Sequence, residues 1–130
     1  MEKTQVGKVE ISFYENMVNA KSIAQRVNKS KSFNLLRAEF GYSEMLHVNL
    51  EVESNLPKWM RKVSGGYTNQ VAVINIEHIQ RKSNNSSEVE TWVVKIIVHE
   101  FFHFLMRKSG IDLPVWIDEG LAEYFSGRTL

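Results

Sequence analysis

Two histidines and a glutamate in the stretch His99-Glu100-Phe101-Phe102-His103 have types and spacing suited to chemistry at a metal ion. In a helix, positions four residues apart lie on the same face about one turn apart, so both imidazoles would point in one direction. Two nitrogens at that separation can bind one metal ion. The carboxylate of Glu100 would lie beside the pair, where it can accept a proton from water without itself binding the metal.

This stretch matches the His-Glu-x-x-His pattern of zinc hydrolases. Its surroundings predict a helix from Ser87, with Glu90 completing a capping box, to Lys108, and Gly110 is the expected stop. The helix is apolar on almost every side, which is typical of a buried helix. Ionisable groups in such a helix are unfavourable unless they are paired. This favours a metal site over the alternative, core histidines held by hydrogen bonds with Glu100 in an ion pair.

A metal held by two histidines needs a third protein ligand, and the fourth position is left for water. The sequence has no cysteine and only four histidines, so the ligand must be another histidine or a carboxylate. The candidates are His47, His78, Asp118, Glu119 and Glu123.

The three acidic candidates lie on a second predicted helix, from about Pro114 to Phe125. Glu119 and Glu123 are four residues apart and therefore share one face. The alternative for them is a solvated acidic face, which their apolar neighbours disfavour. The small residues Gly120 and Ala122 are expected to allow close approach to the histidine helix.

Together, His99-Glu100-x-x-His103 and Trp116-x-x-Glu119-Gly120-x-Ala122-x-Tyr124 resemble the gluzincin metallopeptidases, the clan of thermolysin and the aminopeptidase N-like enzymes. The resemblance is specific over residues 99–125, and the compact minigluzincins are the most similar in size. It implies one zinc ion per chain, with His99, His103 and Glu119 as ligands and Glu100 as general base and proton shuttle. It also implies that Glu123 hydrogen-bonds the first histidine, and Asp118 is the candidate for the same role toward His103.

The function that this resemblance implies is hydrolysis of peptide bonds, in peptide or protein substrates, by a metal-activated water. Large gluzincins add a helical lower subdomain that closes the cleft and often supplies a Tyr or His to stabilise the oxyanion, whereas this sequence ends 11 residues after Glu119. Arg128, Tyr124 and Tyr67 are the candidate substitutes. We therefore expect a peptidase that is active or latent, and the alternative is a catalytically inactive zinc-binding domain with a regulatory or interaction role.

The rest of the sequence predicts one α+β domain over residues 1–130. Alternating apolar residues predict strands over 8–13, 45–52 and 67–76, and a helical pattern covers 15–40 with a polar break at 28–32. Mixed strands and helices followed by two helices are typical of the α+β class. The resemblance implies the N-terminal subdomain of a zincin, a small mixed sheet packed on the histidine helix. Residues 65–76 are its candidate cleft edge, which would bind an extended peptide by strand addition.

Composition excludes several other classes. Sixteen basic and 15 acidic residues give a net charge of +1, which provides no basic surface for nucleic acid. The most apolar run, residues 92–106, is too short and too charged to span a bilayer. Since the N-terminus lacks the apolar stretch of a signal peptide, we expect a cytoplasmic protein. Nothing in the sequence supports self-association.

Overall fold

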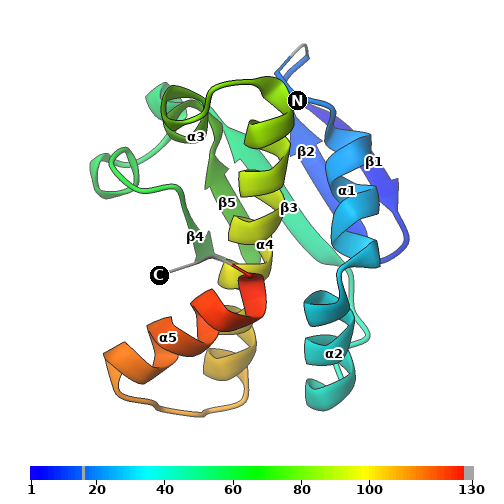
Figure 1. Cartoon of the computed structure of the whole chain (residues 1–130), viewed down its shortest axis with the longest axis vertical. Coiled ribbons are helices and arrows are strands. Elements are labelled where there is room, and N and C mark those ends of the chain that lie inside the picture. The colour runs from blue at the N-terminus through cyan, green and yellow to red at the C-terminus, as the bar shows by residue number, and fades with distance from the viewer. Residues whose placement is uncertain (16, 128–130) are drawn as a thin grey trace.

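The computed structural model describes residues 1–15 and 17–127, which form a mixed five-stranded sheet and five α-helices (Figure 1). This is the α+β class that the sequence predicts. The strands are β1 (Glu2–Val6), β2 (Val9–Phe13), β3 (Leu46–Glu51), β4 (Gly65–Thr68) and β5 (Val71–Asn75). The helices are α1 (Ala20–Lys29), α2 (Lys31–Phe40), α3 (Ile76–Lys82), α4 (Ser86–Lys108) and α5 (Val115–Ser126). Two 3-10 turns, η1 (Glu53–Asn55) and η2 (Lys58–Met60), connect β3 to β4.

The strand order in the sheet is β1-β2-β3-β5-β4. The central strands β2, β3 and β5 are parallel, and β1 and β4 pair antiparallel with their neighbours at the two edges. Asn69 and Gln70, with φ of 50° and 64°, form the two-residue turn between β4 and β5. Positive φ at both positions is typical of a tight hairpin turn. The single strand predicted over 67–76 is therefore wrong: this segment is a hairpin that leads directly into α3.

The main core lies between one face of the sheet and the helices α1 and α4, which lie against it (Figure 1). The alternating apolar residues of β3 face this core, in which Leu46, Val48 and Leu50 are buried. From α4, Ile97 and Phe101 are fully buried. The apolar sides of α4 thus fix the helix in place and determine where its histidines point.

The ends of the helices follow from short polar signals. The side chain of Asn85 accepts a hydrogen bond from the backbone N–H of Glu88 at 2.9 Å, so α4 begins before the predicted cap at Ser87. It ends at Lys108 as predicted, with Gly110 at φ 70° just beyond. Ser30 ends α1 and caps α2, accepting from the N–H of Phe33, which accounts for the polar break in the 15–40 pattern.

Two elements have no counterpart among the sequence predictions. β1 is an edge strand that is mostly exposed, so it lacks the alternating apolar pattern that indicates a strand. α3 is a short helix whose start is capped by Asn75, whose side chain accepts from the N–H of His78. None of the helices in the described ranges combines the length and apolarity needed to cross a membrane.

Candidate metal centre

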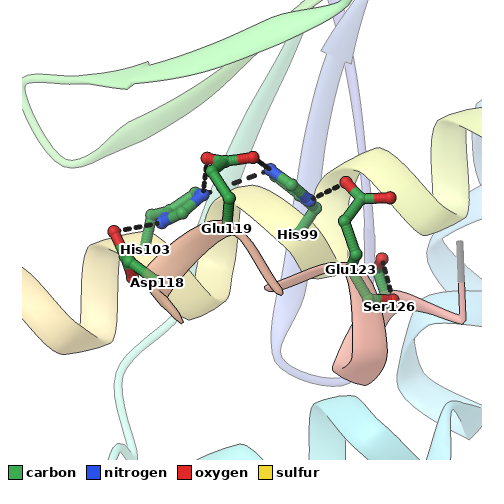
Figure 2. Close-up of polar contacts among 6 residues, drawn as sticks. All are labelled: His99, His103, Asp118, Glu119, Glu123 and Ser126. Atoms are coloured by element: carbon green, nitrogen blue, oxygen red, sulfur yellow. Dashed lines mark hydrogen bonds and ion pairs between the residues drawn. The ribbon is translucent and has the colours of Figure 1, made fainter. Parts of the chain in front are cut away.

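The predicted ligands His99, His103 and Glu119 come together, with one ligand atom from each lying within 4.8 Å of the others. The two Nε2 atoms of the histidines are 3.1 Å apart. Glu119 places its carboxylate oxygens 2.8 Å from Nε2 of His103 and 3.6 Å from Nε2 of His99 (Figure 2). Two imidazoles and a carboxylate from two helices therefore converge on one small volume.

The other ring nitrogen of each histidine, Nδ1, contacts a carboxylate of its own. Nδ1 of His99 lies 2.9 Å from Glu123, and Nδ1 of His103 lies 3.1 Å from Asp118 (Figure 2). In a neutral imidazole one nitrogen donates and the other accepts. In the neutral tautomer with the proton on Nδ1, each histidine would turn the lone pair of its Nε2 toward the carboxylate of Glu119. Three electron-rich groups that face one another form a site suited to a cation.

The histidines and the carboxylates of this centre come from two different helices. His99 and His103 lie one turn apart on α4, whereas Asp118, Glu119 and Glu123 come from α5, which packs across the C-terminal half of α4 (Figure 1). Ala122 of α5 is completely buried in the main core.

The close-approach role predicted for Gly120 is wrong, because a Cβ at that position would meet nothing within 4 Å. Ala122, two residues on, is the small residue of α5 that is buried in the core.

The centre is buried on one side and open on the other. His99 and His103 are 5% and 7% exposed, while the side chain of Glu119 is 54% exposed. Glu119 faces a cleft of about 320 Å³, here called the metal-site cleft. Its walls come from η2, β4, α4 and α5, and its lining residues are Trp59, Gly65, Gly66, Tyr67, Glu100, His103, Arg107, Asp118 and Glu119.

Glu100 lies in this cleft without belonging to the group of three ligands. It follows His99 directly on α4 and is 9% exposed. Glu100 therefore lines the same cleft as His103 and Glu119, although most of it is buried.

Tyr67 of β4 brings a phenol to the same cleft. Its ring stacks on Phe104 with centroids 4.5 Å apart, and within the described part of the chain its hydroxyl is buried without a hydrogen-bond partner. Burial, with smaller contributions from Tyr42 and Glu100, raises the pKa of Tyr67. The hydroxyl therefore stays protonated at neutral pH.

Two other residues, Tyr124 and Arg128, were candidates for stabilising the oxyanion. Tyr124 is 78% exposed on α5 and is not among the residues that line the cleft. Arg128 lies outside the described residues.

The remaining histidines lie elsewhere. His47 of β3 contacts Glu10 at 3.1 Å across the sheet, and His78 is on α3. Neither belongs to the group of possible ligands. Trp59 and Arg107 line the cleft without having been predicted, because no spacing rule connects a 3-10 turn or a helix end to a distant site.

Comparison of the chain with models of known protein families, with curated proteins and with solved structures finds no match. Evidence about function therefore comes from the geometry alone, in which His99, His103 and Glu119 converge and Glu100 lines the same cleft.

Proposed function

We propose that this protein is a zinc-dependent metallopeptidase of the gluzincin type, with one zinc ion per chain. The observation that carries the proposal is the shared orientation of two histidines: each Nδ1 contacts a carboxylate, and both Nε2 atoms face Glu119. A solvated acidic face would not hold two buried imidazoles in this arrangement. The placement of a histidine helix against a mixed sheet, followed by a glutamate-bearing helix, supports a zincin-like fold.

The donor set fits zinc. Two imidazole nitrogens and one carboxylate oxygen are ligands that zinc takes in catalytic sites, with a fourth position open. Zn–N bonds of 2.0–2.1 Å at a tetrahedral angle put two nitrogens roughly 3.3 Å apart. The 3.1 Å between the two Nε2 atoms is close to that separation. His99, His103 and Glu119 would hold the ion, and Glu123 and Asp118 would keep the imidazoles in the required tautomer.

When bound, zinc supplies Lewis-acid chemistry, polarising the scissile carbonyl and lowering the pKa of water toward neutrality. Glu100 takes one proton from the attacking water and delivers it to the nitrogen of the leaving amine as the C–N bond breaks. Its carboxylate returns to the ionised state in each cycle. Its position in the cleft beside His103 supports this role.

The edge strand β4 supports a peptide as the substrate. Gly65, Gly66 and Tyr67 line the metal-site cleft, and β4 pairs with β5 on one side only. An extended peptide could add to the other side of β4 by backbone hydrogen bonds. Such bonds do not depend on the side chains of the peptide, so they suit a protein or peptide substrate. The peptide would then pass Glu100 and Glu119.

A catalytically inactive zinc-binding interaction domain is the second candidate. It is favoured by exposed apolar side chains on α5, the same helix that carries Glu119: Val115 is 79% exposed, Trp116 77% and Tyr124 78%. Exposed apolar side chains that adjoin one another, as Val115 and Trp116 do in the sequence, mark contact surfaces for partners. Glu100 is the general base in the peptidase, whereas an interaction domain needs no general base.

The deciding experiment compares zinc-loaded wild-type protein with Glu100→Gln on denatured casein, with and without a chelator. We expect wild-type cleavage that the chelator stops and added zinc restores. Glu100→Gln should keep its zinc and cleave about 10²–10⁴-fold more slowly, the range for loss of a general acid–base.

The matched control is Glu90→Gln, the same change on the same helix outside the metal-site cleft. It should cleave like wild type. Absence of cleavage by zinc-loaded wild-type protein would favour the interaction domain instead.

A further inference from the structure

The described residues also form a second cavity, which shares no lining residue with the metal-site cleft. It has a volume of about 290 Å³ and is here called the Trp92 cavity. It is formed by α3, α4 and the residue before β4, and its lining residues are Ser64, Ile79, Lys82, Ser83, Glu88, Trp92 and Ile96. Ile79 and Ile96 are buried, and Trp92 is half-buried. The Trp92 cavity thus combines an apolar wall, from Ile79, Trp92 and Ile96, with four polar or charged lining residues.

Size and charge limit what this cavity could hold. Pockets for drug-sized molecules are about 300–1,000 Å³, so this one lies just below that range and suits a single large side chain. Lys82 and Glu88 place one positive and one negative charge in the lining. Their charges balance, which favours an uncharged group inside.

The Trp92 cavity and the metal centre lie along one face of α4. Trp92, Ile96, His99 and His103 are spaced by four, three and four residues, which keeps them on the same side of a helix. The edge strand follows the same path: Ser64 lines the Trp92 cavity, and Gly65 to Tyr67 line the metal-site cleft. A Cβ on Gly65 would lie 3.0 Å from Ile96, so strand and helix touch between the two spaces.

The distance between Glu100 and the Trp92 cavity can be converted into a number of residues of an extended peptide. From Glu100, the residues Ile96 and Trp92 are about 6 and 12 Å away along the helix axis, at 1.5 Å per residue. An extended peptide advances about 3.3 Å per residue. A peptide lying on β4 with its scissile bond at Glu100 would therefore bring a side chain two to four residues away to the Trp92 cavity.

We propose that the Trp92 cavity is a specificity subsite that takes an apolar or aromatic side chain of the substrate, two to four residues from the cleaved bond. This inference rests on the proposed peptidase function, because it uses a peptide on β4. Selection arises from burial of the side chain against Ile79, Trp92 and Ile96. A large apolar residue at the matching position should raise kcat/KM by about tenfold to a hundredfold over alanine, as hydrophobic pockets do.

The first test maps the sites that zinc-loaded protein cleaves in denatured casein by mass spectrometry. We expect large apolar residues to be enriched at one position two to four residues from the cut. A peptide containing a preferred site is then compared with its alanine counterpart at that position. Equal kcat/KM for the two peptides would overturn the subsite and leave the peptidase function standing.

A variant that fills the cavity provides a second arm. Ser83→Phe places a ring at the cavity wall, whereas Ser87→Phe makes the same change at an exposed position outside the lining. Ser83→Phe should lower kcat/KM for the apolar peptide to the level of the alanine peptide and leave the alanine peptide unaffected. Ser87→Phe should cleave both peptides like wild type. Unchanged preference in Ser83→Phe would contradict the assignment.

Binding to the metal-free protein tests the cavity without catalysis. The probes are acetyl-Ala-Ala-Phe-Ala-Ala-amide and its all-alanine counterpart. Their binding is measured by the amide chemical shifts of the wild-type chain. We expect the phenylalanine peptide to shift Ser64, Ser83 and the indole N–H of Trp92 more strongly than the alanine peptide does. Equal effects of the two peptides would overturn the subsite, even if casein cleavage itself is absent and the peptidase function fails.

Discussion

Nδ1 of His99 lies 2.9 Å from a carboxylate oxygen of Glu123, one helix away and 24 positions later in the sequence. This contact orients the ring so that its Nε2 lies toward Glu119, 3.6 Å away. A carboxylate behind a ligating histidine also raises the basicity of the imidazole. The affinity of the centre for a metal should therefore depend on a residue that does not bind the metal.

We predict that Glu123→Ala lowers zinc affinity about 10- to 100-fold, the range for loss of such a partner. Competition with a chromophoric chelator measures the dissociation constant. The control is Glu39→Ala, an exposed glutamate on α2 outside the cluster, which should bind zinc like wild type. Unchanged affinity in Glu123→Ala would mean that the contact does not orient His99.

Metal content provides a second prediction. Purified wild-type protein should contain one zinc per chain by elemental analysis, and His103→Ala should contain almost none because two ligands hold zinc poorly. The control is His47→Ala, which removes a histidine that contacts Glu10 on the sheet and should leave the zinc content unchanged. Iron or manganese in place of zinc would contradict the assigned metal, since two histidines and one carboxylate also suit ferrous iron.

Two glycines should respond in opposite directions to the same change. A Cβ on Gly65 would lie 3.0 Å from Ile96 and 3.1 Å from the backbone oxygen of Val73, so Gly65→Ala overpacks the contact between β4 and α4. We expect a loss of unfolding free energy of about 1 kcal/mol or more. Gly120→Ala meets nothing within 4 Å inside a helix and should gain about 1 kcal/mol. Urea unfolding measures both, and a destabilised Gly120→Ala would reveal a close contact at that position.

Tyr67 should make stability fall at alkaline pH. Burial raises the pKa of Tyr67 above its ordinary value of 10.0, so ionisation favours the unfolded chain, and stability is lost as the pH rises above about 10. Tyr67→Phe should lose less stability between pH 7 and pH 11 than wild type does. At pH 7 it should be equally or more stable, because it removes a buried hydroxyl that has no partner among the described residues. Urea midpoints at the two pH values test this, and a clearly less stable variant at pH 7 would mean that the hydroxyl is hydrogen-bonded.

The candidate centre was accessible from the sequence because its spacing is local. One helix turn fixes the relation of His99 to His103, and the same periodicity places Glu119 and Glu123 on one face of α5. The contacts expected of Glu123 with His99 and of Asp118 with His103 are present. Zinc binding and hydrolysis stay predictions that the proposed experiments test.

Other features depend on packing between distant segments, which no local period encodes. The β4–β5 hairpin was missed because Asn69 and Gln70 adopt positive φ without the glycine that usually indicates such a turn. Which of the two small residues of α5 is packed depended on how α5 rotates against the rest of the fold: Ala122 is buried in the core, whereas a Cβ on Gly120 would meet nothing within 4 Å.

The sequence by itself determined that His99 and His103 share one helix face, because helical periodicity sets their order, and the resemblance to gluzincins singled out Glu119 among the candidate third ligands. Only the tertiary structure decided that α5 crosses α4 with Glu119 facing both Nε2 atoms, and that β4 runs past Glu100 to the Trp92 cavity. The physical reason is that the burial of apolar faces, summed over the whole core, fixes how segments far apart in sequence meet.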